Sequence, residues 1–312
     1  MPATDTAPAP DLQALHHGIE ALRAKTPELD ELLRAFGHVT EALAEAAAAL
    51  PEPDLGGFAP DPELLRQGAP LLDQPGAPTV DFRLTVVAPK LFPALAEAFP
   101  ALAERLAALG HDLADPGERR KVLGILREGR PRALANLARR HDLPEGVLAY
   151  VLECLARPGL ERLARALAPG LAAIPWTVWH RGTCPVCGAL PDVSLLRLGE
   201  QEPTEYLKNV SGQRWLSCSV CAHQWRHVRT RCPGCEHDEQ KDRQYLYVDG
   251  NIGERAEICP ECHRYLLTLD AREMDAPPEP RTVALGLLHL DLLARARGLA
   301  PLVPRPWNAA AL

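Results

Sequence analysis

Residues 184–187 read Cys-Pro-Val-Cys, and the same Cys-x-x-Cys spacing returns three times before residue 263. Two residues between thiols let one tight turn aim both sulfurs at a single ion. Four pairs in so short a stretch are typical of two tetrahedral sites of four thiolates each. The predicted metal ligands are Cys184, Cys187, Cys218, Cys221, Cys232, Cys235, Cys259 and Cys262.

The four pairs divide into two similar halves. Each half opens with a Cys-Pro-x-Cys turn, at Cys184 and at Cys232, and its second turn is followed by His-x-aromatic, at His223-Gln-Trp and His263-Arg-Tyr. This repeat favours sequential pairing, with the first four cysteines on one ion and the last four on another. A nested pairing, as in chaperone cysteine-rich domains, is the alternative, although two pairs lack the glycine that follows the cysteines of those repeats.

Metal identity and charge balance follow from the thiolates. Four-sulfur sites suit zinc or a single iron ion, and the spacing does not choose between them. Because four thiolates carry more negative charge than one ion offsets, backbone N–H groups and nearby cations must compensate. The cations offered between the two halves are Arg226, His227, Arg229 and Arg231.

The residue after each pair indicates how closely its turn follows rubredoxin geometry. Gly188 can adopt the positive φ that turns amide groups toward sulfur. Ala222, Glu236 and His263 hold the matching places in the other turns, and residues with a side chain avoid that region. The sequence therefore does not predict ideal rubredoxin geometry at all four turns.

Other chemistries fit these cysteines less well. Secreted disulfides are disfavoured because residues 1–12 have neither the basic residue nor the apolar core of a signal peptide. A dithiol oxidoreductase needs one pair at a strand–helix junction, and ferredoxin clusters need a denser run of cysteines. The ninth cysteine, Cys154, is predicted to be a small buried side chain in a helix.

Histidines and tryptophans near the cysteines are expected to play structural roles. A full thiolate complement makes histidine ligands unnecessary, so none is predicted among His180, His223, His227, His237 and His263. The aromatic residues Trp176, Trp179, Trp215 and Trp225 are predicted to fill the cores of the small metal domains, with a docking surface as the alternative.

Composition excludes several function classes. The 312-residue chain has a formal net charge of −7, and acidic residues outnumber basic ones between Arg181 and Asp270, whereas phosphate recognition needs a net basic face. No nucleic-acid partner is therefore expected. No stretch of eighteen apolar residues occurs, so we expect no membrane insertion. We also expect no enzyme activity, because nucleophile motifs, phosphate loops and dinucleotide fingerprints are missing.

Helical periodicity dominates the chain before the cysteines. The second predicted helix has Pro27 at its first position and Thr26 as its N-cap. Helices are predicted over residues 12–25, 27–50, 63–67, 93–109, 117–128, 130–141, 144–167 and, after the cysteines, 283–296.

The predicted fold class is α+β. An N-terminal all-helical domain is followed by two tandem metal domains like rubredoxin or zinc ribbons, and then by a C-terminal helix. The predicted boundaries are a disordered tail over 1–10, the helical domain over 11–175, the metal domains over 176–230 and 231–275, and the C-terminal helix and tail over 276–312.

The cysteine region is similar to a known family. Four stretches carry the resemblance, namely residues 179–188 (Trp-His-Arg-Gly-Thr-Cys-Pro-Val-Cys-Gly), 214–221, 225–232 and 256–266. They resemble the FdhE family of formate dehydrogenase accessory proteins, specifically from Trp179 to Leu269 and more loosely in the helical part. Trp215, where tyrosine is usual, and Leu267, where lysine is frequent, depart from the family pattern, and neither is a predicted ligand.

The resemblance implies an assembly factor rather than a catalyst. Members of the family are required for active respiratory formate dehydrogenase and bind its molybdenum- and selenocysteine-containing catalytic subunit around the time of twin-arginine export. They act in the cytoplasm and carry two rubredoxin-like domains behind a helical domain. The resemblance thus implies two metal ions per chain, iron rather than zinc. A rubredoxin-like electron carrier and a zinc-ribbon nucleic-acid-binding protein are the alternative functions, and a homodimer is a further candidate assembly.

Overall fold

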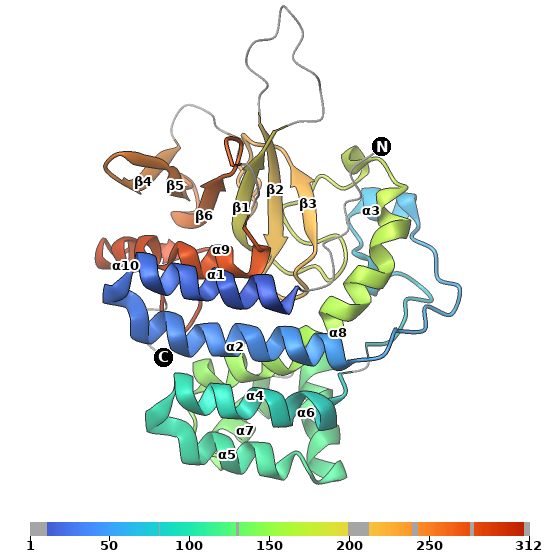
Figure 1. Cartoon of the computed structure of the whole chain (residues 1–312). Coiled ribbons are helices and arrows are strands. Elements are labelled where there is room, and N and C mark those ends of the chain that lie inside the picture. The colour runs from blue at the N-terminus through green and yellow to red at the C-terminus, as the bar shows by residue number, and fades with distance from the viewer. Residues whose placement is uncertain are drawn as a thin grey trace, which may run out of the picture. The chain divides into compact units, whose positions relative to one another are not determined.

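The computed structural model describes residues 11–80, 82–128, 131–198, 212–238, 243–274 and 278–308. They form two compact units. The helical unit contains the described residues up to Asp54 and Thr79–Ala166, and the sheet unit contains Leu55–Pro78 and the described residues from Leu167 onward. Helices at the start of the chain, a sheet region with the cysteines and helices at the end confirm the predicted α+β class (Figure 1). The predicted tail over 1–10 lies outside the described residues.

Amphipathic helices build the helical unit. Helix α1 packs on α2, α2 on α4, and α4 on α5. Within this unit, the rings of Phe36, Phe99 and Tyr150 meet edge to face with centroids 6.0–6.4 Å apart. The helices of this unit are α1 (Leu12–Lys25), α2 (Asp30–Ala49), α4 (Leu84–Ala98), α5 (Ala103–Asp112), α6 (Pro116–Glu128), α7 (Pro131–Arg140) and α8 (Glu145–Ala172), whose last residues belong to the sheet unit.

Two details of the helix prediction differ in the helical unit. Thr26 is the N-cap residue of a 3-10 turn over Pro27–Leu29 and not of the α-helix itself, since α2 begins only at Asp30. Its hydroxyl makes no capping bond and donates instead to the carbonyl of Leu22. The single helix predicted over 93–109 is two helices, α4 and α5. The break follows from Pro100, because a proline restricts the residue before it to extended conformations, and Phe99 accordingly has φ −129° and ψ 67°.

A sheet that combines parallel and antiparallel pairs organises the second unit. Its path is β3-β2-β1-β6-β5-β4, with β7 added beside β6. The elements of this unit are β1 (Pro191–Arg197), β2 (Gln213–Cys218), β3 (Gln224–His227), β4 (Gln244–Val248), β5 (Asn251–Ile258), β6 (Arg264–Asp270), β7 (Ala300–Pro301), α3 (Pro62–Gln67), α9 (Pro280–Gly286) and α10 (Leu288–Ala296).

The two cysteine regions share this sheet. Strands β1, β2 and β3 come from the first region and β4, β5 and β6 from the second, with antiparallel pairing inside each region. Strands β1 and β6 join the regions as a parallel pair, in which Val193 lies opposite Leu267 and Leu195 opposite Leu269. The two metal domains predicted in tandem are therefore parts of one hydrogen-bonded sheet.

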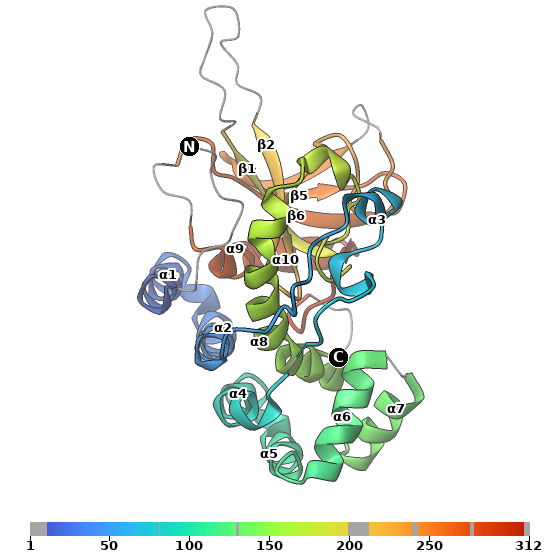
Figure 2. The ribbon, with the colours of Figure 1, turned by 90° about the vertical axis from the view of Figure 1, so that its right-hand side faces the viewer.

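Helices α9 and α10 cover one face of the sheet (Figures 1 and 2). Val283, Leu287 and Leu290 pack there against strand residues such as Leu195 and Leu267. The prediction of a single helix over 283–296 is wrong in one respect, because Leu287 has φ −99° and ψ 9° and separates α9 from α10.

None of the described helices alone is both long and apolar enough to cross a bilayer. Only the combined length of α4 and the segment Pro100–Asp112, which meet at a bend of 118°, reaches that length and apolarity.

Candidate metal centres

All four Cys-x-x-Cys pairs form the same hydrogen-bonded turn. The first cysteine of each pair donates its backbone N–H to the carbonyl five residues later, at 2.8–2.9 Å: Cys184 to Ala189, Cys218 to His223, Cys232 to His237, and Cys259 to Arg264. In three turns the N–H two residues after the first cysteine points at its sulfur, at 3.4 Å: Val186 to Cys184, Val220 to Cys218, and Gly234 to Cys232. These amide dipoles offset thiolate charge.

Every turn places the residue after its second cysteine in the left-handed region. Gly188 has φ +77°, Ala222 +56°, Glu236 +61° and His263 +54°. The positive φ that the sequence favoured only at Gly188 is therefore present in all four turns. The hydrogen bonds of the turn outweigh the local preference of three residues with side chains, at a strain of about 1 kcal/mol each.

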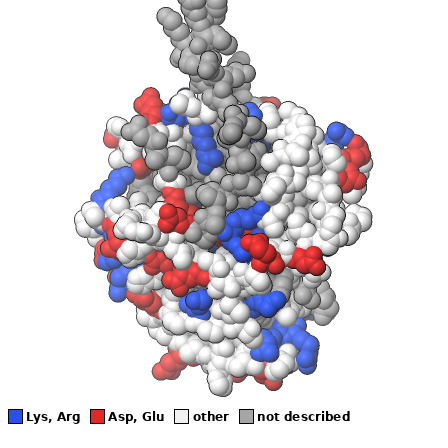
Figure 3. Space-filling model, turned by 45° about the vertical axis from the view of Figure 1, so that its right-hand side comes forward, with Lys and Arg blue, Asp and Glu red and all other residues white. Residues whose placement is uncertain are grey.

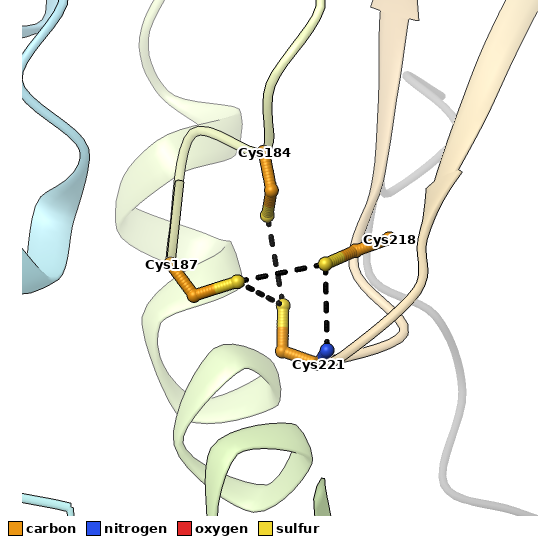
Figure 4. Close-up of side chains that lie close together, drawn as sticks. All are labelled: Cys184, Cys187, Cys218 and Cys221. Carbon is orange, nitrogen blue, oxygen red and sulfur yellow. Dashed lines mark hydrogen bonds between the residues drawn. The ribbon is translucent and has the colours of Figure 1, made fainter. Parts of the chain in front are cut away.

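The first group of sulfurs has the dimensions of a tetrahedral metal site (Figure 4). The Sγ atom of Cys187 lies 3.5 Å from the Sγ atom of Cys218 and 3.6 Å from the Sγ atom of Cys221. The Sγ atoms of Cys221 and Cys184 are also 3.6 Å apart. An ion bound at about 2.3 Å by four sulfurs would separate them by about 3.8 Å. The observed distances are far from the roughly 2.05 Å of a disulfide, and the four thiols are free.

The second group has similar dimensions. The Sγ atoms of Cys232 and Cys262 lie 3.9 Å apart, and those of Cys235 and Cys259 lie 3.6 Å apart. Within each group all four sulfurs fall within 4.8 Å of one another. The structure thus brings together the sets that sequential pairing predicts, and the two groups could hold two metal ions.

The two groups differ in exposure. In the first, Cys184, Cys218 and Cys221 are buried and Cys187 is half-buried, whereas Cys235 of the second group is exposed. A segment distant in sequence fixes the first turn: the N–H groups of Leu71 and Leu72 donate to the carbonyls of residues 185 and 186, at 2.8 and 3.0 Å. Burial raises the pKa of the Cys184 and Cys221 thiols, so thiolates at these positions need a bound cation.

The main buried cation near the second group is one that the sequence analysis missed. Arg214 on β2 is buried, and burial lowers the pKa of its guanidinium, an effect that Glu257 and the Cys232 thiol oppose. His227 was predicted as a counter-charge, but desolvation lowers its pKa to about 3, so it is neutral at physiological pH. That prediction is wrong. No local sequence signal distinguishes Arg214 from the other arginines, because its burial arises from pairing between the two cysteine regions.

The remaining predicted residues take the following places. Among the described residues, neither sulfur group includes a histidine. Trp179 and Trp225 are buried, as expected for core residues, whereas Trp176 is 39% exposed and does not belong to the core. Cys154 is fully buried in α8, as predicted for a small apolar side chain.

The fold and the sulfur groups define a class of protein, one with a helical unit and a sheet that carries two potential four-thiolate centres. Part of the chain is also similar to known proteins. Residues 183–229 match the family described as FdhE, central domain. A protein named FdhE homolog from Stutzerimonas stutzeri (strain A1501) is 34% identical over 155 residues, which are 44% of this chain and 47% of that protein.

Pseudomonas aeruginosa supplies two further similar proteins. Its FdhE homolog is 34% identical over 152 residues, covering 42% of this chain and 46% of that protein. The crystal structure of an FdhE protein from that organism matches with a TM-score of 0.53 and 24% identity, covering 99% of this chain and 98% of the other, which shows a shared fold. The chain is thus similar to FdhE proteins in its cysteine region, where the sequence pattern predicted that resemblance. Its alignments span about half the length of these curated relatives.

Proposed function

We propose that this protein is an accessory factor in the maturation of a respiratory formate dehydrogenase and binds the catalytic subunit of that enzyme. The observation that carries the proposal is the FdhE central-domain match over residues 183–229 together with the two four-sulfur groups. In this role the protein acts in the cytoplasm, before export of the subunit, and catalyses no reaction of its own.

We further propose that each sulfur group binds one ion through its own four cysteines. Sulfur separations of 3.5–3.9 Å and the N–H groups that point at sulfur support the fit. The family resemblance favours iron. Protein purified from its native host should then show thiolate-to-iron charge-transfer absorption in the visible range, whereas zinc would leave it colourless. A colourless, zinc-loaded protein from that host would contradict the assignment of iron.

The sheet unit is the proposed docking surface. From the sequence alone, residues 190–209 and 237–255 are expected to be contact loops, but their described parts are largely the strands β1, β4 and β5. Positions 199–209 and 239–242 lie outside the described residues. In the described part, the β4–β5 hairpin exposes Tyr245, Val248 and Ile252, which are 48%, 50% and 59% accessible. Exposed apolar side chains gathered on one hairpin are typical of a protein contact, and Cys235 of the second group is also exposed.

Co-purification from the native host tests this function. Wild-type protein should capture the catalytic subunit of formate dehydrogenase. The double substitution Cys232→Ser, Cys235→Ser should reduce capture, because it removes two ligands of the second sulfur group and disorders that site. Cys154→Ala is the matched control, because it removes a thiol outside both groups. Undiminished capture by a stable, half-metallated variant would place docking elsewhere. Failure of wild-type protein to capture the subunit would overturn the functional assignment.

An electron carrier is the second candidate function, and the exposure of Cys235 favours it, because electron exchange requires a metal site near the surface. Reversible reduction of the bound iron would support this candidate, and a redox-inert ion would exclude it. The nucleic-acid alternative lacks such support. On the face shown in Figure 3, basic and acidic side chains of the described residues are interspersed, whereas phosphate binding needs a continuous basic surface.

A further inference from the structure

A small cavity borders the first sulfur group within the sheet unit. Its volume is about 50 Å³, and Pro185, the second residue of the first Cys-x-x-Cys turn, forms part of its lining. Aliphatic side chains of Leu65, Leu171 and Ile174 and the three indoles of Trp176, Trp179 and Trp225 form most of the wall. A concave, mainly apolar lining of this kind is typical of a ligand site.

The polar side chains of the cavity are His223, Gln224, the Trp225 indole N–H and Arg226. Trp225 is 5% exposed, and its indole Nε1–H has no hydrogen-bond partner among the described residues. By contrast, the neighbouring Trp179 donates its Nε1–H to the carbonyl of Thr183 at 2.8 Å. Leaving a buried donor unpaired costs about 1–3 kcal/mol. An acceptor oxygen supplied by a ligand would recover that free energy.

Arg226 supplies a positive charge beside the same cavity. Its guanidinium carbon lies 4.3 Å from the ring centroid of Trp176, which is 39% exposed. Within the described part of the chain, no carboxylate lies within ion-pairing distance of this arginine. A guanidinium held on an aromatic face keeps its N–H groups available for a carboxylate. The cavity therefore combines apolar walls with a free donor and an unpaired cation.

Cavity size limits what can enter. Because one water molecule needs roughly 10–15 Å³ of such a cavity, the cavity has room for about four heavy atoms, the number in the isobutyl group of leucine. A whole metabolite would not fit, but one aliphatic side chain of a longer polypeptide would. The adjacent arginine then selects a segment with an acidic residue beside that side chain.

We propose that this cavity binds a leucine-sized aliphatic side chain of a partner polypeptide, that the acidic side chain of the next residue pairs with Arg226, and that an oxygen of the same segment accepts the Trp225 N–H. The site is distinct from both sulfur groups, and it does not depend on the proposed maturation role, because free peptides can probe it.

The test uses the full chain, loaded with metal and labelled with 5-fluorotryptophan, and follows ¹⁹F resonances assigned by single Trp→Phe substitutions. The probe is N-acetyl-Leu-Asp-amide. Its addition should shift the resonances of Trp176 and Trp225 and leave those of Trp215 and Trp307, which do not line the cavity, unchanged. The matched probes N-acetyl-Leu-Asn-amide, without the charge, and N-acetyl-Ala-Asp-amide, without the isobutyl group, should each bind at least fivefold more weakly.

Two substitutions separate charge from volume. Arg226→Gln should weaken binding of the Leu-Asp probe at least fivefold, to about the affinity of the Leu-Asn probe. Leu171→Phe should fill the cavity from its half-buried wall and abolish the resonance shifts while leaving Arg226 in place. Arg297→Gln, at an exposed arginine that does not line the cavity, is the control and should change nothing. Unchanged metal content of all variants verifies that the sheet unit is folded.

Several results would overturn the proposal. They are equal binding of the Leu-Asp and Leu-Asn probes, undiminished binding by Arg226→Gln, and the same shift in all five tryptophans. Absence of any resonance shift at the solubility limit of the Leu-Asp probe would also overturn the proposal. Concentration-dependent dimerisation of wild-type protein that Arg226→Gln removes would instead identify a second copy of the chain as the occupant, contradicting a distinct partner.

Discussion

Arg214 on β2 places its Nη2 atom 3.1 Å from Oε2 of Glu257 on β5, and both side chains are buried, at 2% and 7% exposure. The pair joins the two cysteine regions, because each region contributes one partner. Arg243 and Arg255 also contact the Glu257 carboxylate, each at 3.1 Å. Burial alone would raise the pKa of Glu257, but the three arginines outweigh that effect and lower it.

Glu257→Gln should therefore destabilise the sheet unit. It leaves three arginines around a neutral side chain, and removing one partner of a buried ion pair costs about 3–5 kcal/mol. The measurement is urea denaturation of the metal-loaded protein. Glu273→Gln, at an exposed carboxylate, should have an effect below about 0.5 kcal/mol. A loss for Glu257→Gln no larger than that of the control would show that the cluster contributes nothing to stability.

Substitutions at two turn residues with positive φ should change the free energy of unfolding in opposite directions. Ala222→Gly should raise the free energy of unfolding by about 0.5–1 kcal/mol, because glycine relieves the strain at φ +56°. Gly188→Ala should lower it by about 1 kcal/mol or more, since it adds strain at φ +77° and places Cβ 3.3 Å from Cγ of Pro70. Denaturation with saturating metal measures both changes, and equal signs would refute this account.

Metal content tests whether the two groups act independently. Wild-type protein should hold close to two ions per chain, one for each sulfur group. The double substitution Cys218→Ser, Cys221→Ser should remove about one of them, because all its changes fall in the first group. Elemental analysis of purified protein gives the number. Loss of both ions together, or of neither, would contradict sequential, independent sites.

The ion bound by the second sulfur group should be released to a chelator before the ion bound by the first group. Cys235 is exposed, so a chelator can reach its sulfur, whereas three sulfurs of the first group are buried. Stopped-flow mixing with a chromogenic chelator should give two phases of about one ion each. The variant Cys218→Ser, Cys221→Ser, which keeps only the second group, should show the fast phase alone. Slow release from that variant would reverse the assignment.

His227 should contribute to acid sensitivity. Burial is the main cause that lowers its pKa to about 3, and Arg214, Arg231 and Arg243 lower it further. Because the unfolded chain, with a histidine pKa of about 6.5, takes up the proton first as pH falls, stability is lost below pH 6.5. From pH 7.5 to 5.5 this residue should cost about 1.4 kcal/mol of unfolding free energy.

The variant His227→Leu removes the titrating group and should be less sensitive to pH by that amount. Urea denaturation at the two pH values measures it, with metal content determined at both values so that loss of ions is not mistaken for titration. Parallel pH profiles of wild type and variant would show that His227 is not the group responsible.

The order and spacing of residues in the sequence determined the bounds of the first helix and the composition of the two sulfur groups. The helix predicted over 12–25 has the bounds of α1. In the structure Asp11 caps it by accepting from the N–H groups of Gln13 and Ala14, and such caps depend only on neighbours in sequence. The sulfur groups were also predictable, because two residues between thiols fix a turn and the repeat of the halves favours one pairing.

Only the tertiary structure decided how the two halves combine. The parallel pairing of β1 with β6 brings Arg214 and Glu257 together, although they are far apart in the chain. The same structure holds Ala222 in a left-handed conformation that its own preference opposes. Spacing encodes contacts between near neighbours, whereas burial, charge pairing and strain depend on residues that meet only when distant strands pair.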